Sequence, residues 1–184
     1  NPEKLDAALV VGCGQFGLAV IAALKLRGVG PVVAADFSPR RRALAEPLGA
    51  DVVVDPAKEK AVGAWAKAAG GRQPLFFECV GVPGMIGELM REAPRGARIV
   101  VAGVCMELDR FQPMHGINKE LSLQFVLGYT PDEFASALRD LAEGRIPADR
   151  LVTGRTGIEG VAAAFETLRD PEAHAKILVE PGAV

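Results

Sequence analysis

Gly12-Cys13-Gly14-Gln15-Phe16-Gly17 is the stretch that decides how this chain folds. It has the spacing G-x-G-x-x-G and lies between an apolar run at 7–11 and a helical pattern at 15–27. An uninterrupted apolar run is typical of a strand that is buried on both faces. A strand, a glycine-rich loop and a helix in that order predict a turn that binds the phosphates of a dinucleotide.

Each glycine of this loop has its own predicted role. Gly12 permits a tight turn, Gly14 leaves no Cβ between backbone N–H groups and a pyrophosphate, and Gly17 lets the helix pack on the strand. The helix N-terminus adds unpaired N–H groups and the positive end of its dipole. The pattern alone is weak in a chain with 21 glycines, so a purely structural turn is the alternative interpretation.

Apolar runs alternate with helical stretches along the rest of the chain. Ser38 followed by Pro39 predicts a helix start, and Thr130 with Glu133 predicts a capping box. Six strands with helical crossovers predict an α/β fold: a doubly wound, mostly parallel six-stranded Rossmann sheet with helices on both faces. The expected strands are 7–11, 32–36, 52–54, 75–78, 98–102 and 121–127; the expected helices are 15–27, 39–48, 59–69, 83–92 and 130–143.

The chain divides into a sheet domain and a tail. We expect residues 1–150 to form the dinucleotide-binding domain and residues 151–184 to form an addition with a helix at 158–168 and a strand at 175–179. Residues 106–120 show no clean period, which predicts an exposed loop with some helix.

Composition excludes several classes of protein. The 184 residues are 49% hydrophobic and 24% charged, which predicts a real core rather than disorder. A net charge of −2 argues against a nucleic-acid partner. Three dispersed cysteines and two histidines give no metal-ligand spacing. With no apolar run near the ~18 residues of a membrane span and no leader in the opening NPEKLD, we expect a cytoplasmic protein without a membrane partner.

Asp36 ends the second expected strand, about 20 residues after the glycine loop, as in dinucleotide-binding folds. A carboxylate there accepts hydrogen bonds from the adenosine ribose and repels a 2′-phosphate, which favours NAD over NADP. Arg40, Arg41 and Arg42 complicate this prediction because arginines can receive that phosphate, although a charge run is usually a solvated helix face. With Asp36 present, NAD is the predicted cofactor.

Two further strand ends are expected to reach the same crevice. They are Cys79-Val80-Gly81 and Ala102-Gly103-Val104. Ligands of open α/β sheets bind outside the carboxyl ends of the strands, at the point where the strand order reverses. Glycines there would allow close approach of a dinucleotide, although each segment alone is also consistent with an ordinary turn. Glu78 is expected near the adenosine ribose from its placement at a strand end.

No side chain is a strong candidate for a catalytic group. Cys13 reads as a small packing residue, since no histidine can be placed beside it. His115 in the expected loop and His174 before the last strand read as surface or capping residues. We therefore expect neither a catalytic residue nor a metal ligand in this chain.

Taken together, the ordered motifs resemble the medium-chain, zinc-type alcohol dehydrogenase superfamily, and the resemblance covers essentially the whole chain. It is specific for the superfamily and not for a substrate. It implies the C-terminal NAD(H)-binding domain of an alcohol or polyol dehydrogenase, in which a hydride passes between a small alcohol or carbonyl substrate and nicotinamide. The matching segments are 12–17, Asp36, FECVG at 77–81, VAGV at 101–104, GADVVVDP at 49–56, NKEL at 118–121 and the tail at 157–181.

The resemblance also implies roles for single residues. Phe37 would pack against adenine, Arg41 would lie near the ribose, and Lys176 would reach the pyrophosphate. The segment 102–104 would line the nicotinamide pocket. The full set of implied cofactor-binding residues is Gly12, Gly14, Gln15, Phe16, Gly17, Asp36, Phe37, Arg41, Cys79, Val80, Ala102, Gly103, Val104 and Lys176.

Members of this superfamily carry a separate catalytic domain ahead of the sheet domain, with Cys, His and Glu ligands for zinc. This sequence begins almost at its first strand, so zinc is expected only in that other domain, to which the tail 151–184 would return. The chain is then expected to be a fragment that binds NAD weakly and turns over nothing alone. Because an apolar strand edge needs cover, we also expect a homodimer through residues 121–127.

Three other functions stay open at this point. A zinc-independent quinone or enoyl reductase of the same superfamily usually prefers NADPH, against which Asp36 argues. A non-catalytic NAD-sensing module would also explain the absence of zinc ligands. A methyltransferase-like domain shares a glycine loop and an acidic strand end, but the spacing of the last glycine and the VAGV segment favour a dinucleotide.

Overall fold

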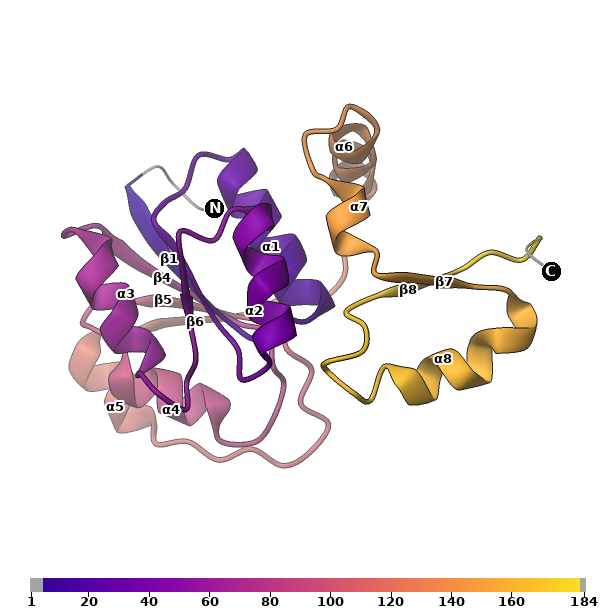
Figure 1. Cartoon of the computed structure of the whole chain (residues 1–184). Helices are drawn as coiled ribbons and strands as arrows, with labels where there is room; N and C mark the ends of the chain where they lie inside the picture. Colours follow the sequence, from indigo (N-terminus) through magenta and orange to yellow (C-terminus); the bar gives the residue numbers. More distant parts are fainter. Residues whose placement is uncertain (1–4, 183–184) are drawn as a thin grey trace.

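The computed structural model describes residues 5–182, so residues 1–4 of the expected domain and 183–184 of the tail lie outside it. Its main sheet has the order β3-β2-β1-β4-β5-β6, and every neighbouring pair is parallel. The doubly wound parallel sheet is therefore confirmed (Figure 1). Its strands are β1 (Asp6–Val11), β2 (Val32–Ala35), β3 (Val52–Val54), β4 (Gln73–Glu78), β5 (Arg98–Val101) and β6 (Ser122–Phe125).

Strand β1 lies at the centre of the sheet and contributes side chains to two separate apolar clusters. Ala7, Leu9 and Val11 belong to one apolar cluster, and Ala8 and Val10 belong to the other. Successive side chains of a strand point to opposite faces, so both sets are buried only if both faces are covered. This is the physical reason for the continuous apolar run in the sequence.

Helices cover both faces of the sheet, as Figure 1 shows. On the α3 side, Trp65 donates its indole N–H to the Ala7 carbonyl at 2.9 Å and meets the ring of Phe76 edge-on, with centroids 5.1 Å apart. A buried indole needs such a partner, so this contact fixes α3 against β1. One face carries α1 (Gln15–Leu26), α2 (Pro39–Ala45) and the 3₁₀ turn η1 (Glu46–Leu48); the other carries α3 (Ala61–Ala69), α4 (Met85–Glu92) and α5 (Pro113–Lys119).

Residues 130–182, which comprise the end of the expected sheet domain and the tail, are richer in structure than the sequence suggests. The capping box is confirmed: Glu133 N–H donates to Thr130 Oγ1, and Thr130 N–H donates to Glu133 Oε2 at 2.7 Å. The prediction of a single strand in the tail was wrong, because β7 (Gly154–Thr156) pairs in parallel with β8 (Ile177–Val179). The helical elements are α6 (Pro131–Ala142), α7 (Ala148–Leu151), the 3₁₀ turn η2 (Ile158–Gly160) and α8 (Val161–Thr167).

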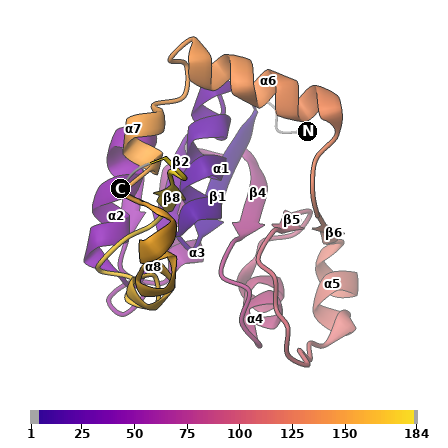
Figure 2. The same cartoon turned by 90° about the vertical axis from the view of Figure 1, so that its right-hand side faces the viewer.

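The tail packs on the α1 and α2 side of the sheet. Ala175 is buried within the same apolar cluster as Leu18 and Ile21 of α1, and Leu151 packs against that cluster. Thr153 Oγ1 accepts hydrogen bonds from the backbone N–H groups of Ala175 and Lys176, which holds the approach to β8 in place. Figure 2 shows α7, α8 and β8 beside α2, with α6 across the far end of the sheet.

Several boundaries differ from the sequence-based expectation. Strand β2 stops at Ala35, one residue before Asp36, and α3 and α4 begin two residues later than expected. The region 106–120 contains the helix α5, which begins with Pro113 as its first residue. Within residues 5–182, no helix has the length and apolar character needed to cross a bilayer.

Candidate functional site

A cavity of about 750 Å³ opens at the carboxyl ends of β1, β2 and β4. Strands β2 and β3 extend from β1 in one direction, and β4, β5 and β6 extend in the other. The cavity therefore lies where the strand order reverses, as expected for a ligand site in an open α/β sheet. Sequence-predicted residues that line it are Gly12, Gly14, Asp36, Phe37, Arg41, Cys79 and Val80.

The opposite walls come from elements that the sequence did not single out. Residues 60–62 at the start of α3, together with Met85 and Leu89 of α4, line the cavity. Pro171 of the tail lines it as well. The apolar residues of α3 and α4 carry no signal of a binding role in the sequence, because their pattern is that of any amphipathic helix.

The glycine loop is built as its spacing predicts. Gly12 has φ +92°, and a Cβ there would lie 3.0 Å from the Cys79 carbonyl group. A Cβ on Gly17 would lie 1.8 Å from the Gly12 carbonyl oxygen, so only glycine lets α1 approach this loop. A Cβ on Gly14, in contrast, would meet nothing nearer than the Arg41 guanidinium at 4.0 Å. The space beside Gly14 is therefore empty as far as the Arg41 guanidinium.

The N-terminus of α1 is open to an anion. Its N-cap is Gly14, no side chain caps it, and its first turn contains no acidic residue. Helix N-termini carry unpaired N–H donors and a partial positive charge that favour phosphate groups. Because this terminus meets the cavity at Gly14, the loop fits a diphosphate.

Asp36 joins the glycine loop to the turn between β2 and α2. Its Oδ2 accepts from the Cys13 backbone N–H at 2.7 Å, and its Oδ1 accepts from the Ser38 N–H at 2.8 Å. An ionised carboxylate has about four acceptor positions, so each oxygen keeps capacity for a ligand hydroxyl. The side chain is half-buried at the cavity wall, which is where a ribose would have to be bound.

Arg41 contributes a cation to the same wall. Its backbone N–H donates to Ser38 Oγ at 3.0 Å, which fixes the start of α2. Its Nε is buried without a hydrogen-bond partner among the described residues, and its guanidinium lies over Gly14. A guanidinium held in this way fits an oxygen-rich anion on the glycine loop.

Other predicted site residues do not line the cavity. Gly103 packs against Gly81, where a Cβ on Gly103 would lie 2.4 Å from the Gly81 nitrogen. These two glycines therefore allow two turns to touch, a role that the sequence argument did not consider. Lys176 lies just before β8 and not within it. The predicted residues outside the lining are Gln15, Phe16, Gly17, Ala102, Gly103, Val104 and Lys176.

Glu78 is buried and has a structural role in the turn after β4, while its expected place near the adenosine ribose stays a prediction. It is 1% exposed, and its Oε1 accepts from the N–H groups of Val80 and Gly81 at 2.6 and 2.8 Å. A buried carboxylate needs such donors. Glu78 thus shapes the turn after β4, which in turn places Val80 in the cavity wall.

The environment of Cys13 and Cys79, near the glycine loop, makes both thiols unreactive. Burial is the main cause that raises the pKa of Cys13 and of Cys79 to about 12, with Asp36 adding to the first and Glu78 to the second. Both groups remain thiols at neutral pH, which agrees with a packing role for Cys13. Within the described residues, no group of three or more His, Cys, Asp or Glu side chains could hold a metal ion.

Comparison with known proteins gives a consistent result. The family model "Zinc-binding dehydrogenase" matches residues 16–143. The chain is 33% identical over 178 residues to (R,R)-butanediol dehydrogenase of Bacillus subtilis, covering 96% of this chain and 51% of that protein. It is 30% identical over 165 residues to sorbitol dehydrogenase of Ovis aries, covering 88% and 46%.

Solved structures agree with these sequence matches. The crystal structure of 2R,3R-butanediol dehydrogenase from Bacillus subtilis superposes with a TM-score of 0.83 at 32% identity, over 96% of this chain and 51% of that one. An Escherichia coli protein described as a short chain alcohol dehydrogenase, complexed with NADH, gives 0.83 at 26% identity over 96% and 52%. The chain spans about half the length of the curated relatives it matches. On this evidence the chain belongs to the zinc-binding dehydrogenase family, of which it contains the Rossmann-type sheet.

Proposed function

We propose that the chain binds NAD(H) and serves as the cofactor domain of an alcohol or polyol dehydrogenase. The observation that carries this proposal is the wall of the cavity at the strand-order reversal. There an uncapped helix N-terminus, an open glycine and the Asp36 carboxylate lie together. Those groups match the diphosphate and the ribose of a dinucleotide.

The chain's own residues would bind and orient the cofactor. Gly14 and the first turn of α1 would hold the pyrophosphate, with the Arg41 guanidinium above it. Asp36 would accept hydrogen bonds from the adenosine ribose, and Phe37 and Val80 would border the adenine. Because the cavity lies along β1, β2 and β4, it would hold the adenosine half of the cofactor. The proposed nicotinamide contacts of residues 102–104 and the pyrophosphate contact of Lys176 are further parts of this proposal.

When bound, a nicotinamide dinucleotide supplies hydride transfer to or from its nicotinamide ring. The described residues do not fit a zinc ion, since they hold no cluster of candidate ligands. Alcohol activation is therefore not assigned to them. Their part is to position the dinucleotide.

The relatives help to choose among the alternatives. The similar proteins are butanediol and sorbitol dehydrogenases, which supports a small alcohol or polyol, or the matching carbonyl, as substrate of the whole enzyme. A related structure carries NADH, which supports NAD over NADP together with Asp36. Quinone or enoyl reduction and non-catalytic NAD sensing have less support.

Calorimetry with NADH and ADP-ribose tests this function. We expect saturable binding of one NADH per chain, with ADP-ribose competing for the same site because it keeps every group that the cavity would contact. Adenosine, which lacks phosphates, should bind at least tenfold more weakly, since each lost charge-assisted hydrogen bond contributes about 1.5–3 kcal/mol. Absence of heat with millimolar NADH would refute the proposal.

We also propose a homodimer through the free edge of β6. This strand ends the sheet, and Phe125, Leu127 and Tyr129 beside it are 63%, 93% and 73% exposed. An unpaired apolar edge favours association with another strand. Sedimentation at tens of micromolar should give the dimer mass, and Leu127→Lys should give the monomer. Phe165→Lys, at an exposed apolar residue of α8 on the side of the molecule away from β6 (Figure 2), should stay dimeric; a monomeric parent chain contradicts the proposal.

A further inference from the structure

We infer that Glu172, supplied by the tail, is a second acidic determinant of cofactor choice, beside Asp36. It would disfavour a 2′-phosphate at the adenosine end of the cavity. This inference rests on the proposed binding of NAD(H) and adds a residue that the nucleotide-binding motif does not contain. It follows from the contacts that join the tail to the first turn of α2.

The tail segment around Pro171 closes one side of the cavity next to Ser38. Pro171 lines the cavity, and its carbonyl oxygen accepts from Ser38 Oγ at 3.5 Å. Glu172, the next residue, extends its carboxylate to the Arg40 backbone N–H, with 3.3 Å between Oε2 and the nitrogen. A negative charge from the tail is therefore held two residues from Ser38, a residue of the cavity wall.

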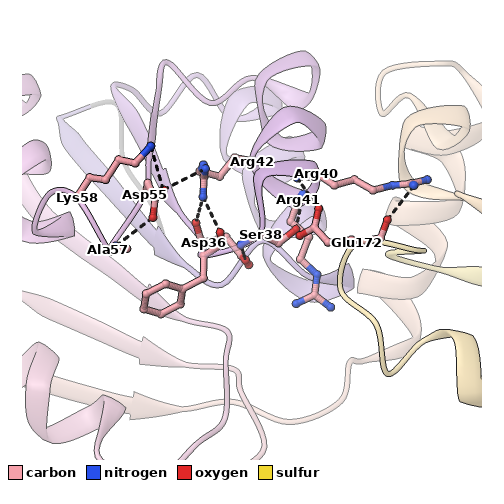
Figure 3. Close-up of polar contacts among 10 residues, drawn as sticks. Asp36, Ser38, Arg40, Arg41, Arg42, Asp55, Ala57, Lys58 and Glu172 are labelled. Atoms are coloured by element: carbon pink, nitrogen blue, oxygen red, sulfur yellow. Dashed lines mark hydrogen bonds and ion pairs between the residues drawn. The ribbon is translucent and has the colours of Figure 1, made fainter.

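The same contacts remove Arg40 from the cavity. Its guanidinium Nη1 donates to the Glu172 carbonyl oxygen at 2.9 Å. Figure 3 shows this side chain pointing to Glu172, away from Asp36. The Arg40 guanidinium keeps its charge, but it donates to the tail and is directed away from the place where a 2′-phosphate would lie.

The Arg42 guanidinium also contacts other groups of the protein. Its Nη1 donates to the carbonyl oxygens of Asp36 and Phe37 at 2.7 and 2.8 Å, and its Nη2 pairs with Asp55 at 3.4 Å. Of the three consecutive arginines, Arg41 is the one that lines the cavity. In Figure 3 no dashed contact joins its guanidinium to Glu172 or Asp55.

The resulting charge arrangement favours a neutral ribose. The hydroxyl that a carboxylate at Asp36 binds in such folds is the 2′ group, so a 2′-phosphate would lie beside the turn formed by residues 36–40. Two carboxylates contact that turn: Asp36 accepts from the Ser38 N–H, and Glu172 accepts from the Arg40 N–H. Both carboxylates would repel a 2′-phosphate there, whereas of the three arginines Arg41 is the one that faces it from the cavity wall, and the pyrophosphate would share that guanidinium.

Glu172→Gln tests the inference because it removes the charge and keeps an oxygen that can accept from Arg40 N–H. Dissociation constants for NADH and NADPH are measured by calorimetry for the parent chain and the variant at 20 mM and 500 mM salt. We expect NADPH to bind about three- to tenfold more tightly to the variant at low salt, and this gain to fall below about twofold at high salt. NADH affinity should stay within about twofold.

Glu143→Gln is the matched control. It makes the same change of net charge at the end of α6, which lies at the end of the sheet away from the cavity (Figure 2), and should leave both constants unchanged. If the parent binds NADH but Glu172→Gln leaves the NADPH-to-NADH ratio unchanged, or shifts both constants equally, the inference is wrong while the proposed function stands. If the parent binds neither dinucleotide, both are wrong.

Discussion

Gly17→Ala is expected to destabilise the chain by about 3 kcal/mol and to abolish NADH binding. The added Cβ would lie 1.8 Å from the Gly12 carbonyl oxygen and 2.9 Å from its carbon, and both belong to backbone that cannot rotate away. Either α1 must move off the sheet or the glycine loop must change its path. For a chain of this size, the melting temperature should fall by about 6–12 °C, which calorimetric scanning measures directly.

Gly14→Ala separates the loss of stability from the loss of NADH binding. Its Cβ would point into open space near Arg41, and its φ of −72° is allowed for any residue. We therefore expect a loss of stability below about 1 kcal/mol, the usual scale for alanine at an N-cap, with NADH affinity reduced at least tenfold. A Gly17→Ala chain that melts with the parent would contradict the packing argument.

Asp36→Ala is expected to weaken NADH binding about 100-fold. The variant loses the proposed hydrogen bonds to the ribose, and it also releases the N–H groups of Cys13 and Ser38 that Asp36 holds. The glycine loop and the α2 turn then lose their common anchor. Binding of NADPH should weaken much less, because the repulsion of its 2′-phosphate disappears at the same time.

Asp51→Ala controls for the structural part of this effect. Asp51 likewise accepts from a backbone N–H, that of Val32 at 2.7 Å, and it pairs with Lys25. It does not line the cavity. Both variants should lose about 1–2 kcal/mol of stability, but Asp51→Ala should bind NADH as the parent does. Equal affinities for NADH in Asp36→Ala and the parent would remove Asp36 from the site.

Local signals in the sequence were sufficient to predict the central strand, the glycine loop and the start of α6. The run at 7–11 predicted a strand with both faces covered, and β1 has that environment. Glycine spacing predicted the close packing of α1 at Gly17, and Thr130 with Glu133 predicted the start of α6. Each of these signals acts over a few residues, where chain geometry alone limits the outcome.

The weaker predictions failed where partners come from distant parts of the chain. The three residues of β7 have no strand pattern, because their pairing with β8 is decided more than 20 residues later. Gly81 and Gly103 lie in the turns that follow β4 and β5, and nothing in the sequence shows that these turns touch. Glu78 was expected near the ribose from its place at a strand end, and the sequence did not indicate that it also accepts from the N–H groups of its own turn.

The sequence by itself determined the parallel sheet, the glycine loop and the acidic residue that follows β2, since hydrophobic periodicity and the absence of a Cβ are properties of single positions and their neighbours. Only the tertiary structure decided how the three arginines are used. Arg40 and Glu172 are 132 residues apart, and a long charged side chain bonds to whichever acceptor the fold brings within reach. The glycine loop at the cavity is local in origin, whereas the wall at Pro171 and the direction of the Arg40 side chain depend on the tail.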